Sequence, residues 1–227
     1  MSRILVFDVN ETLLDLGALD PLFEEMFGDA GARRTWFGLV LRNAMALTIM
    51  GERSDFVTVG GASLQMVAES RGVTLADDAA HTIGGALRTL PPHHDVVPGL
   101  TALRDGGLRM VALTNSPQAT AEAQLANAGL GPFFERIMSV ESSGRFKPAA
   151  EVYRMAADEL GTSTGDLRMV AAHDWDIAGA MRTGYAGAYV VRPGMARNPL
   201  HPTPDVIGGD LEEVAASILR VETGRDT

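Results

Sequence analysis

Polar residues that could do chemistry follow four apolar runs of the chain, close to where each run stops. They are Asp8, residues 114–116 (Thr-Asn-Ser), Lys147 and residues 173–176 (His-Asp-Trp-Asp). In an open parallel sheet, ligands bind at the carboxyl ends of the strands. A carboxylate, a hydroxyl with an amide, a lysine and a histidine would then meet at one edge of the sheet. We therefore predict an active site there, with Asp8 as its covalent nucleophile.

The pattern around these residues predicts the elements that position them. Arg109 and Arg168 lie near the starts of two runs, where we expect their side chains to reach solvent, and Ser116 is the expected N-cap of a helix that starts at Pro117. Apolar runs typical of strands buried on both faces cover 4–7, 108–113, 137–139, 167–172 and 188–191, with helical spacing at 116–128, 149–160 and 176–183. This alternation predicts an α/β fold with a doubly wound parallel sheet.

The segment from about residue 15 to residue 92 breaks the alternation. Four helical patterns follow one another there, at 19–27, 33–50, 54–70 and 77–90, with no convincing strand among them. We interpret residues 17–92 as a helical cap that is inserted into a core formed by residues 1–16 and 93–221. Residues 222–227 are expected to be a frayed tail.

Composition narrows the classes of partner and of site. The formal net charge is −10 and cysteine is absent, which excludes disulfides, thiolate metal sites and cysteine nucleophiles. Because a surface this acidic repels phosphate backbones and anionic lipids, we expect no nucleic-acid or membrane partner. An anionic substrate would need a local positive group. The short apolar run before Asp8 is no signal peptide, and we expect a cytoplasmic protein.

Four ordered motifs carry a resemblance to a known family. Residues 7–13 (Phe-Asp-Val-Asn-Glu-Thr-Leu) resemble the first motif of the haloacid dehalogenase superfamily, and residues 113–116 resemble the second. Lys147-Pro148 is similar to the third motif, and the run that ends at Asp176 is similar to the fourth. Within the superfamily the sequence most resembles the type II, or L-2-haloacid, dehalogenases.

The resemblance implies a reaction and a set of site residues. Asp8 would displace the halogen of a small 2-haloalkanoic acid to form an aspartyl ester, and water would release a 2-hydroxy acid. Lys147 would keep Asp8 ionised, and Asp176 would orient Lys147 or cap the following helix. Independently of the resemblance, the unperturbed pKa of a histidine lies near neutrality, so His173 would activate the water or else only satisfy backbone groups. Residues expected to bind substrate or halide are Thr12, Asn10, Phe37, Thr114, Asn115, Tyr153 and Trp175.

Departures from the family pattern keep rival functions open. The position of the arginine that usually receives the halide falls on Phe37, and His173 replaces an asparagine. Asn10 replaces the second acid of the phosphatases, and residues 171–172 are alanines where those enzymes carry a magnesium-binding acid. We therefore expect no metal or cofactor, with Mg²⁺ reserved for the phosphatase or phosphonatase alternative. Other rivals are a non-halogenated substrate and a non-enzymatic binding role. The expected partner is a small anionic organic substrate, and the resemblance implies a homodimer through the cap helices.

Overall fold

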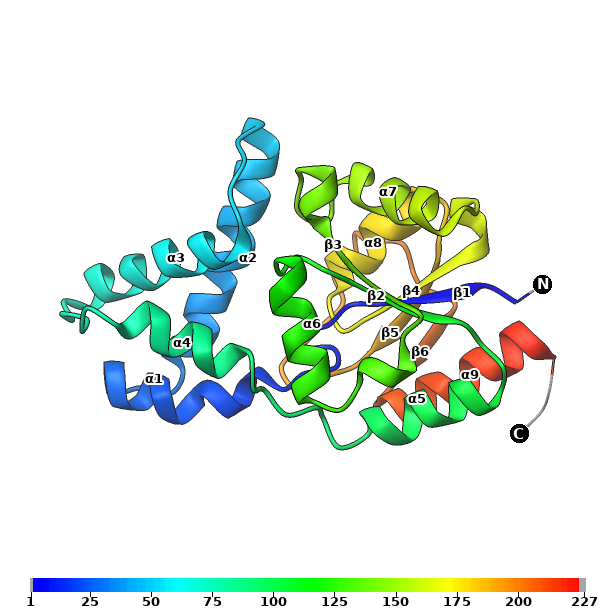
Figure 1. Ribbon diagram of the computed structural model, residues 1–227, viewed down its shortest axis with the longest axis horizontal. Coiled ribbons are helices and arrows are strands. Elements are labelled where there is room, and N and C mark those ends of the chain that lie inside the picture. The colour runs from blue at the N-terminus through cyan, green and yellow to red at the C-terminus, as the bar shows by residue number, and fades with distance from the viewer. Residues whose placement is uncertain (1, 225–227) are drawn as a thin grey trace.

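The computed structural model describes residues 2–224 and contains one parallel sheet, which runs through the right half of Figure 1. The strand order is β3-β2-β1-β4-β5-β6. The strands are β1 (Ile4–Phe7), β2 (Met110–Thr114), β3 (Arg136–Ser139), β4 (Leu167–Ala171), β5 (Ala186–Val190) and β6 (Val206–Gly208). In this order β1 is central and pairs with β2 and β4, so its carboxyl end is flanked by the ends of both neighbours.

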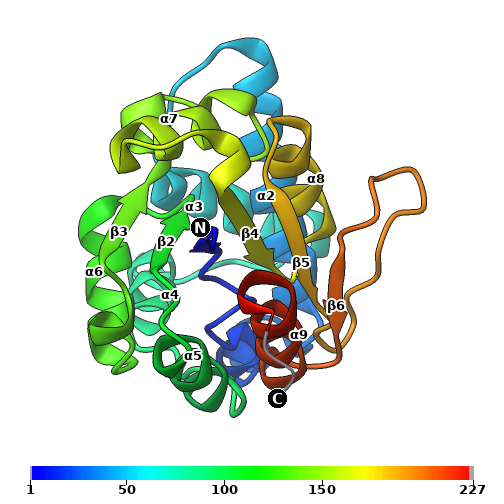
Figure 2. The same ribbon diagram turned by 90° about the vertical axis from the view of Figure 1, so that its right-hand side faces the viewer.

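Helices cover both faces of the sheet, which confirms the predicted doubly wound α/β fold. They are α5 (Val96–Asp105), α6 (Gln118–Asn127), α7 (Ala150–Leu160), α8 (Asp174–Arg182) and α9 (Leu211–Thr223). Figure 2 shows α5 and α9 side by side on one face, with α7 and α8 on the other. Strand β6 was not predicted. Its three residues are too few to form a recognisable apolar run, and the middle one, Ile207, is exposed.

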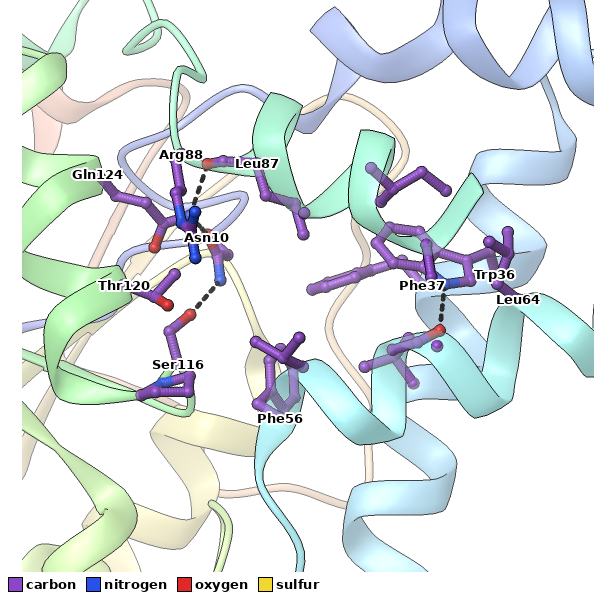
Figure 3. A pocket seen from close by; sticks show the side chains of 18 residues that line it. Asn10, Trp36, Phe37, Phe56, Leu64, Leu87, Arg88, Ser116, Thr120 and Gln124 are labelled. Atoms are coloured by element: carbon purple, nitrogen blue, oxygen red, sulfur yellow. Dashed lines mark hydrogen bonds between the residues drawn. The ribbon is translucent and has the colours of Figure 1, made fainter. Parts of the chain in front are cut away.

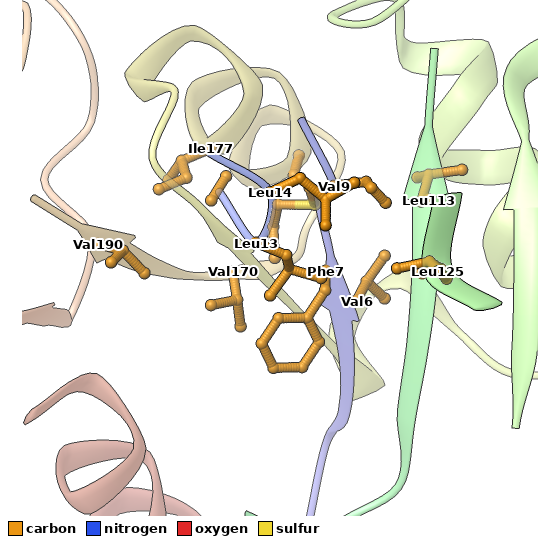
Figure 4. Packing of buried hydrophobic residues seen from close by; sticks show 14 of the residues in the cluster. Val6, Phe7, Val9, Leu13, Leu14, Leu113, Leu125, Val170, Ile177 and Val190 are labelled. Atoms are coloured by element: carbon orange, nitrogen blue, oxygen red, sulfur yellow. The ribbon is translucent and has the colours of Figure 1, made fainter. Parts of the chain in front are cut away.

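The central strand is held by tightly packed apolar side chains. Val6 and Phe7 of β1 are fully buried, as are Leu13 and Leu14 of the loop that follows. Figure 4 shows these residues packed with Val170 of β4. Burying one such side chain contributes about 1.5–3 kcal/mol. The segment on both sides of Asp8 is therefore anchored in the core.

Four further helices follow the first strand. After the short 3₁₀ turn η1 (Leu16–Leu19) come α1 (Asp20–Phe27), α2 (Ala32–Met50), α3 (Phe56–Arg71) and α4 (Ala79–Leu87). This helical block lies beyond the carboxyl ends of the strands, at the left of Figure 1. Its two connections to the core run side by side, since Asp15 N donates to Pro91 O at 2.9 Å and His93 N donates to Leu13 O at 2.9 Å.

Two local predictions are wrong. Arg168 does not reach solvent: its side chain is 0% exposed and its guanidinium donates to Asp205 at 2.6 and 2.8 Å and to Glu222 at 2.9 Å. Glu222 belongs to α9, so the frayed tail does not begin there, and residues 225–227 of that prediction lie outside the described residues. Arg109, in contrast, is 55% exposed, as expected.

The start of α6 also differs from the expectation. The helix begins at Gln118. Pro117 precedes it with an extended backbone (ψ 148°), so neither Pro117 nor Ser116 before it is part of the helix. Ser116 therefore does not cap it, and the Ser116 hydroxyl instead accepts a hydrogen bond from Asn10 Nδ2 at 3.2 Å. Among residues 2–224, no helix is both long and apolar enough to cross a membrane.

Candidate active site

Asp8 stands at the carboxyl end of β1, where its backbone N donates to Val170 O of β4 at 3.1 Å. Its side chain is 8% exposed and both carboxylate oxygens have partners. Lys147 Nζ lies 3.2 Å from Oδ1. Thr12 Oγ1 donates to Oδ2 at 2.7 Å, and His173 Nδ1 lies 3.0 Å from the same oxygen. Residues far apart in the chain thus converge on one carboxylate.

Lys147 is fully buried between two acids. Its Nζ lies 2.8 Å from Asp176 Oδ2 in addition to its contact with Asp8, and its backbone N donates to Asn115 Oδ1 at 3.0 Å. Burial alone would lower the pKa of Lys147, but the charges of Asp176 and Asp8 raise it above its ordinary value. Lys147 therefore remains a cation at neutral pH.

The same contacts keep Asp8 ionised. Burial would raise the pKa of Asp8, but the charge of Lys147 and the hydrogen bond from His173 outweigh it and hold that pKa well below its usual range. Thr12 contributes a further hydrogen bond, and its hydroxyl also accepts from Ala172 N at 2.9 Å, which fixes its orientation. The result is a buried carboxylate ion with fixed partners.

His173 lies between two carboxylates. Its Nε2 lies 2.9 Å from Glu11 Oε2, while its Nδ1 faces Asp8. Burial opposes protonation of the ring, but the two hydrogen bonds raise the pKa of His173 to about 10. In this state the ring is an imidazolium with no lone pair for a proton. It is flanked by Trp175, with ring centroids 4.9 Å apart, and by Phe37 at 6.4 Å.

Two cavities lie next to this cluster, and Phe37 borders both. The larger, about 530 Å³, is lined by charged and aromatic side chains that include Glu11, Arg33, His173 and Trp175. The smaller, about 70 Å³, lies between the cap helices and the β2–α6 loop and is mostly apolar. Figure 3 shows Phe37, Trp36 and Phe56 on the cap side of this smaller cavity, with Asn10 and Ser116 on the core side.

Three residues predicted to contact substrate serve other polar groups. Tyr153 is fully buried and its hydroxyl donates to Asp176, with Oδ1 at 2.7 Å, so it supports that acid and reaches neither cavity. Thr114, 1% exposed, accepts from Ser116 N at 3.1 Å and shapes the turn after β2. Asn10 borders the smaller cavity, but its amide donates to Ser116 and accepts from Gln124 Nε2 at 3.1 Å.

Two residues of this site were missed by the sequence analysis. Glu11, next to the first-motif threonine, contacts His173. Arg33 of α2 is buried, and its Nη1 lies 3.6 Å from Glu11 Oε1 while its Nε donates to Asp20. Arg33 precedes Phe37 by four residues, which places both on the same helix face. This four-residue spacing in the sequence could have indicated that Arg33 places a cation one helical turn from the expected arginine position.

The arrangement suits attack by a carboxylate better than metal binding. Among residues 2–224, no group of three or more histidine, aspartate or glutamate side chains is arranged to hold a metal ion. Asp8 is instead flanked by the two cations Lys147 and His173, which would repel Mg²⁺. A carboxylate oxygen accepts about two hydrogen bonds. In the part of the chain that the structure describes, Oδ2 of Asp8 has two partners and Oδ1 has one, so Oδ1 keeps a lone pair for an electrophile.

The chain is similar in sequence and in fold to several known proteins. A family model described as haloacid dehalogenase-like hydrolase matches residues 3–184. The chain is 26% identical to (S)-2-haloacid dehalogenase H-109 of Pseudomonas putida over 95% of its length and 97% of that protein. It is also 26% identical to haloacetate dehalogenase H-2 of Moraxella sp. (strain B), over 88% and 91%. The solved structure of L-2-haloacid dehalogenase from Xanthobacter autotrophicus shares the fold, with a TM-score of 0.89 at 22% identity, over 95% and 97%.

Proposed function

The chain belongs to the haloacid dehalogenase-like hydrolases, and from this premise we propose that it hydrolyses the carbon–halogen bond of a small 2-haloalkanoic acid. The observation that carries the proposal is the buried Asp8 carboxylate, whose Oδ1 lies 3.2 Å from Lys147 Nζ and has no other hydrogen-bond partner within residues 2–224. The names of the relatives, (S)-2-haloacid dehalogenase and haloacetate dehalogenase, support the substrate class.

In the proposed first step, Asp8 Oδ1 attacks the carbon that bears the halogen. The bond between Oδ1 and the carbon forms as the carbon–halogen bond breaks, so the configuration at that carbon is inverted. The halide leaves with the bonding electrons. A halide needs no proton to leave, so this step requires no acid at the position of Asn10. Lys147 and Thr12 hold the carboxylate in a fixed orientation, which lowers the entropic cost of reaching the attack geometry.

In the second step, water attacks Cγ of the Asp8 ester. The Cγ–Oδ1 bond then breaks and Oδ1 leaves as the hydroxyl oxygen of the 2-hydroxy acid. One proton of the water ends on that hydroxyl and the other is released. The charge of the released proton balances the negative charge of the halide released in the first step. The overall products are the hydroxy acid, halide and one proton. The nucleophile regains its second oxygen from water in every turnover.

The proposed substrate is an anion, and the cavity offers cations to attract it. Arg33, Arg34 and His173 line the larger cavity together with the acids Glu11, Asp15, Asp20 and Asp174. Arg33 and His173 are paired with acids, whereas Arg34 is in no ion pair within residues 2–224. In this proposal, Arg34 replaces the positive charge that an arginine at position 37 would provide. Phe37 then contributes an apolar wall between the two cavities.

The observed contacts disfavour a metal-dependent phosphatase. That chemistry requires an acid to protonate the leaving alcohol, whereas Asn10 occupies the position and its amide is committed to Ser116 and Gln124. Ala171 ends β4 and Ala172 follows it, so neither position supplies a carboxylate ligand for Mg²⁺. We therefore propose a reaction that needs no metal.

The experiment measures halide release from chloro-, bromo- and fluoroacetate and from both enantiomers of 2-chloropropionate, with EDTA and then with Mg²⁺. We expect release in EDTA, its loss in Asp8→Asn, and unchanged release in Asp105→Asn, a substitution of an exposed carboxylate at the end of α5. In H₂¹⁸O, repeated turnover should label the Asp8 peptide, while the product of a single turnover stays unlabelled. If no substrate released halide, the proposal would be contradicted. Mg²⁺-dependent cleavage of a phosphate ester would instead assign the chain to the phosphatase alternative.

A further inference from the structure

Glu11 has an unusual backbone. Its φ is +61°, and it is the one non-glycine residue within residues 2–224 whose φ is positive. The left-handed region is costly for residues with a Cβ and easy for glycine. Backbone strain of this kind persists where the surrounding structure enforces it, often at functional sites. Glu11 N donates to Leu14 O at 2.9 Å, so the turn between Asp8 and Leu14 imposes this conformation.

The strained turn directs the Glu11 side chain into the site. Oε2 lies 2.9 Å from His173 Nε2, and Oε1 lies 3.6 Å from Arg33 Nη1. The Glu11 side chain is 15% exposed and those of His173 and Arg33 are 5% and 6% exposed. Each carboxylate oxygen thus has its own buried cationic partner. Because Glu11 holds Nε2, the opposite ring atom, Nδ1, points at the nucleophile.

The atom that Nδ1 faces is the one that would bear developing charge. If Oδ1 of Asp8 forms the ester, Oδ2 remains as the ester carbonyl oxygen. Thr12 Oγ1 at 2.7 Å and His173 Nδ1 at 3.0 Å already surround Oδ2. Donors 2.7–3.1 Å from the position of an oxyanion are the geometry that stabilises a tetrahedral intermediate.

We propose that Glu11 is a positioning residue that keeps His173 an imidazolium aimed at Asp8 Oδ2, so that His173 and Thr12 form an oxyanion hole for hydrolysis of the ester. This inference rests on the proposed function. As water bonds to Cγ, the C=O electron pair moves to Oδ2 between the two donors. The pair then returns, the Cγ–Oδ1 bond breaks, and the leaving oxygen takes a water proton.

The competing role for His173 is a general base, as the sequence suggested. A base needs a free nitrogen next to the attacking water, whereas Nδ1 is bonded to Oδ2 itself and Nε2 to Glu11. Asp8 and Glu11 of the first loop contact the ring, Arg33 of α2 pairs with Glu11, and Lys147 pairs with Asp8 and Asp176. The other titratable side chains that border the same cavity are Asp15, Asp20, Arg34, His93, Asp174 and Arg192. Ester formation neutralises Asp8, and Glu11 then remains the acid in contact with the ring.

The two roles predict opposite effects of pH. If His173 donates as an imidazolium, ester hydrolysis slows as pH rises through the pKa of the ring. If His173 acts as a base, hydrolysis speeds up over the same range. Loss of Glu11 removes the anion that holds the second proton, so the donor role predicts that the decline moves to lower pH.

The experiment uses Glu11→Gln and Glu11→Gly, with Glu25→Gln on the exposed face of α1 as the matched control. In Asp8→Asn, which mimics the neutral ester, we expect NMR titration to show the His173 pKa falling by about 1–3 units when Glu11→Gln is added. With a 2-haloacid, both Glu11 variants should release a burst of halide and accumulate the Asp8 ester, with hydrolysis slowed about 10²–10³-fold. Both variants lose the carboxylate partner of His173 and Arg33, but Glu11→Gly also relieves the left-handed strain, so its Tm should exceed that of Glu11→Gln.

Several outcomes separate the alternatives. Loss of stability in Glu11→Gly with both steps slowed equally would assign Glu11 a structural role and overturn the inference. Hydrolysis that is unchanged in Glu11→Gln, or that rises with pH, would overturn it as well. No ester on the wild type overturns the proposed function itself, whereas ester formation without an effect of Glu11 overturns this role alone.

Discussion

Lys147 is the only lysine among 227 residues, and it is buried between Asp8 and Asp176. Removing one partner of a buried ion pair leaves an uncompensated charge, which costs about 3–5 kcal/mol. We therefore expect urea unfolding to show that Lys147→Met lowers the free energy of unfolding by about 3–5 kcal/mol. The variant should also give no halide burst, because the pKa of Asp8 rises when its cation is lost. A ¹⁵N-lysine label gives a single side-chain resonance, which should remain protonated from pH 6 to 10. A titration in that range would contradict the ion pair.

His173 makes stability depend on pH. Its pKa is raised from 6.5 to about 10 in the folded protein, so its stabilising effect is complete below pH 6.5 and is lost as pH rises through 10. We expect the free energy of unfolding to fall between pH 7 and 10 by at most about 1.4 kcal/mol per pH unit. His173→Asn should flatten that slope, and His81→Asn, at an exposed position of α4, should keep it. Equal slopes in all three proteins would refute the assignment.

At the scale of elements, Arg168 ties β4 to two segments near the end of the chain. Its buried guanidinium contacts Asp205, just before β6, and Glu222 of α9. We expect Arg168→Leu to lower the free energy of unfolding by about 3–5 kcal/mol, since the 3%-exposed Glu222 carboxylate would keep only Arg3, which is 38% exposed, as a cationic partner within residues 2–224. Arg109→Leu, at an exposed pair just before β2, should cost no more than about 1 kcal/mol. Similar losses in both variants would contradict the role of Arg168.

Strand ends explain why so much of the site was predictable. β1, β2 and β4 are short apolar runs, so the polar residues after them had to lie at one edge once the strands paired in parallel. What the strands do not determine is the direction of a side chain in a loop. Tyr153 and Thr114 carry the expected residue types, but their hydroxyls face Asp176 and the β2–α6 turn.

At the scale of the whole molecule, an acidic protein is proposed to bind an acidic substrate. The net charge of −10 repels a 2-haloacid from a distance, whereas the cations of the larger cavity act only at short range. The Debye length falls from about 30 Å at 0.01 M salt to about 8 Å at 0.15 M. We expect kcat/KM for 2-chloropropionate to rise about two- to threefold over this range in sodium sulfate, because screening removes the repulsion. The uncharged 2-chloropropionamide should show no such rise, and a fall for the acid would mean that the cavity field dominates.

The sequence by itself determined the α/β alternation, the helical insertion after β1 and the group that contains Asp8, Thr12, Lys147, His173 and Asp176. These follow from apolar periodicity and from residue types at strand ends, which are local properties of the chain. The tertiary structure decided which side chains of that group are hydrogen-bonded to one another. In the sequence Glu11 is one more acid of an acidic chain. It reaches His173 because the local Glu11 N–Leu14 O hydrogen bond holds a left-handed turn and because β1 pairs with β4, which ends just before His173. Two carboxylates then face the two ring nitrogens. Because burial makes each unpaired charge costly, we propose that this histidine, for which a base was one of two expected roles, is an imidazolium facing Asp8.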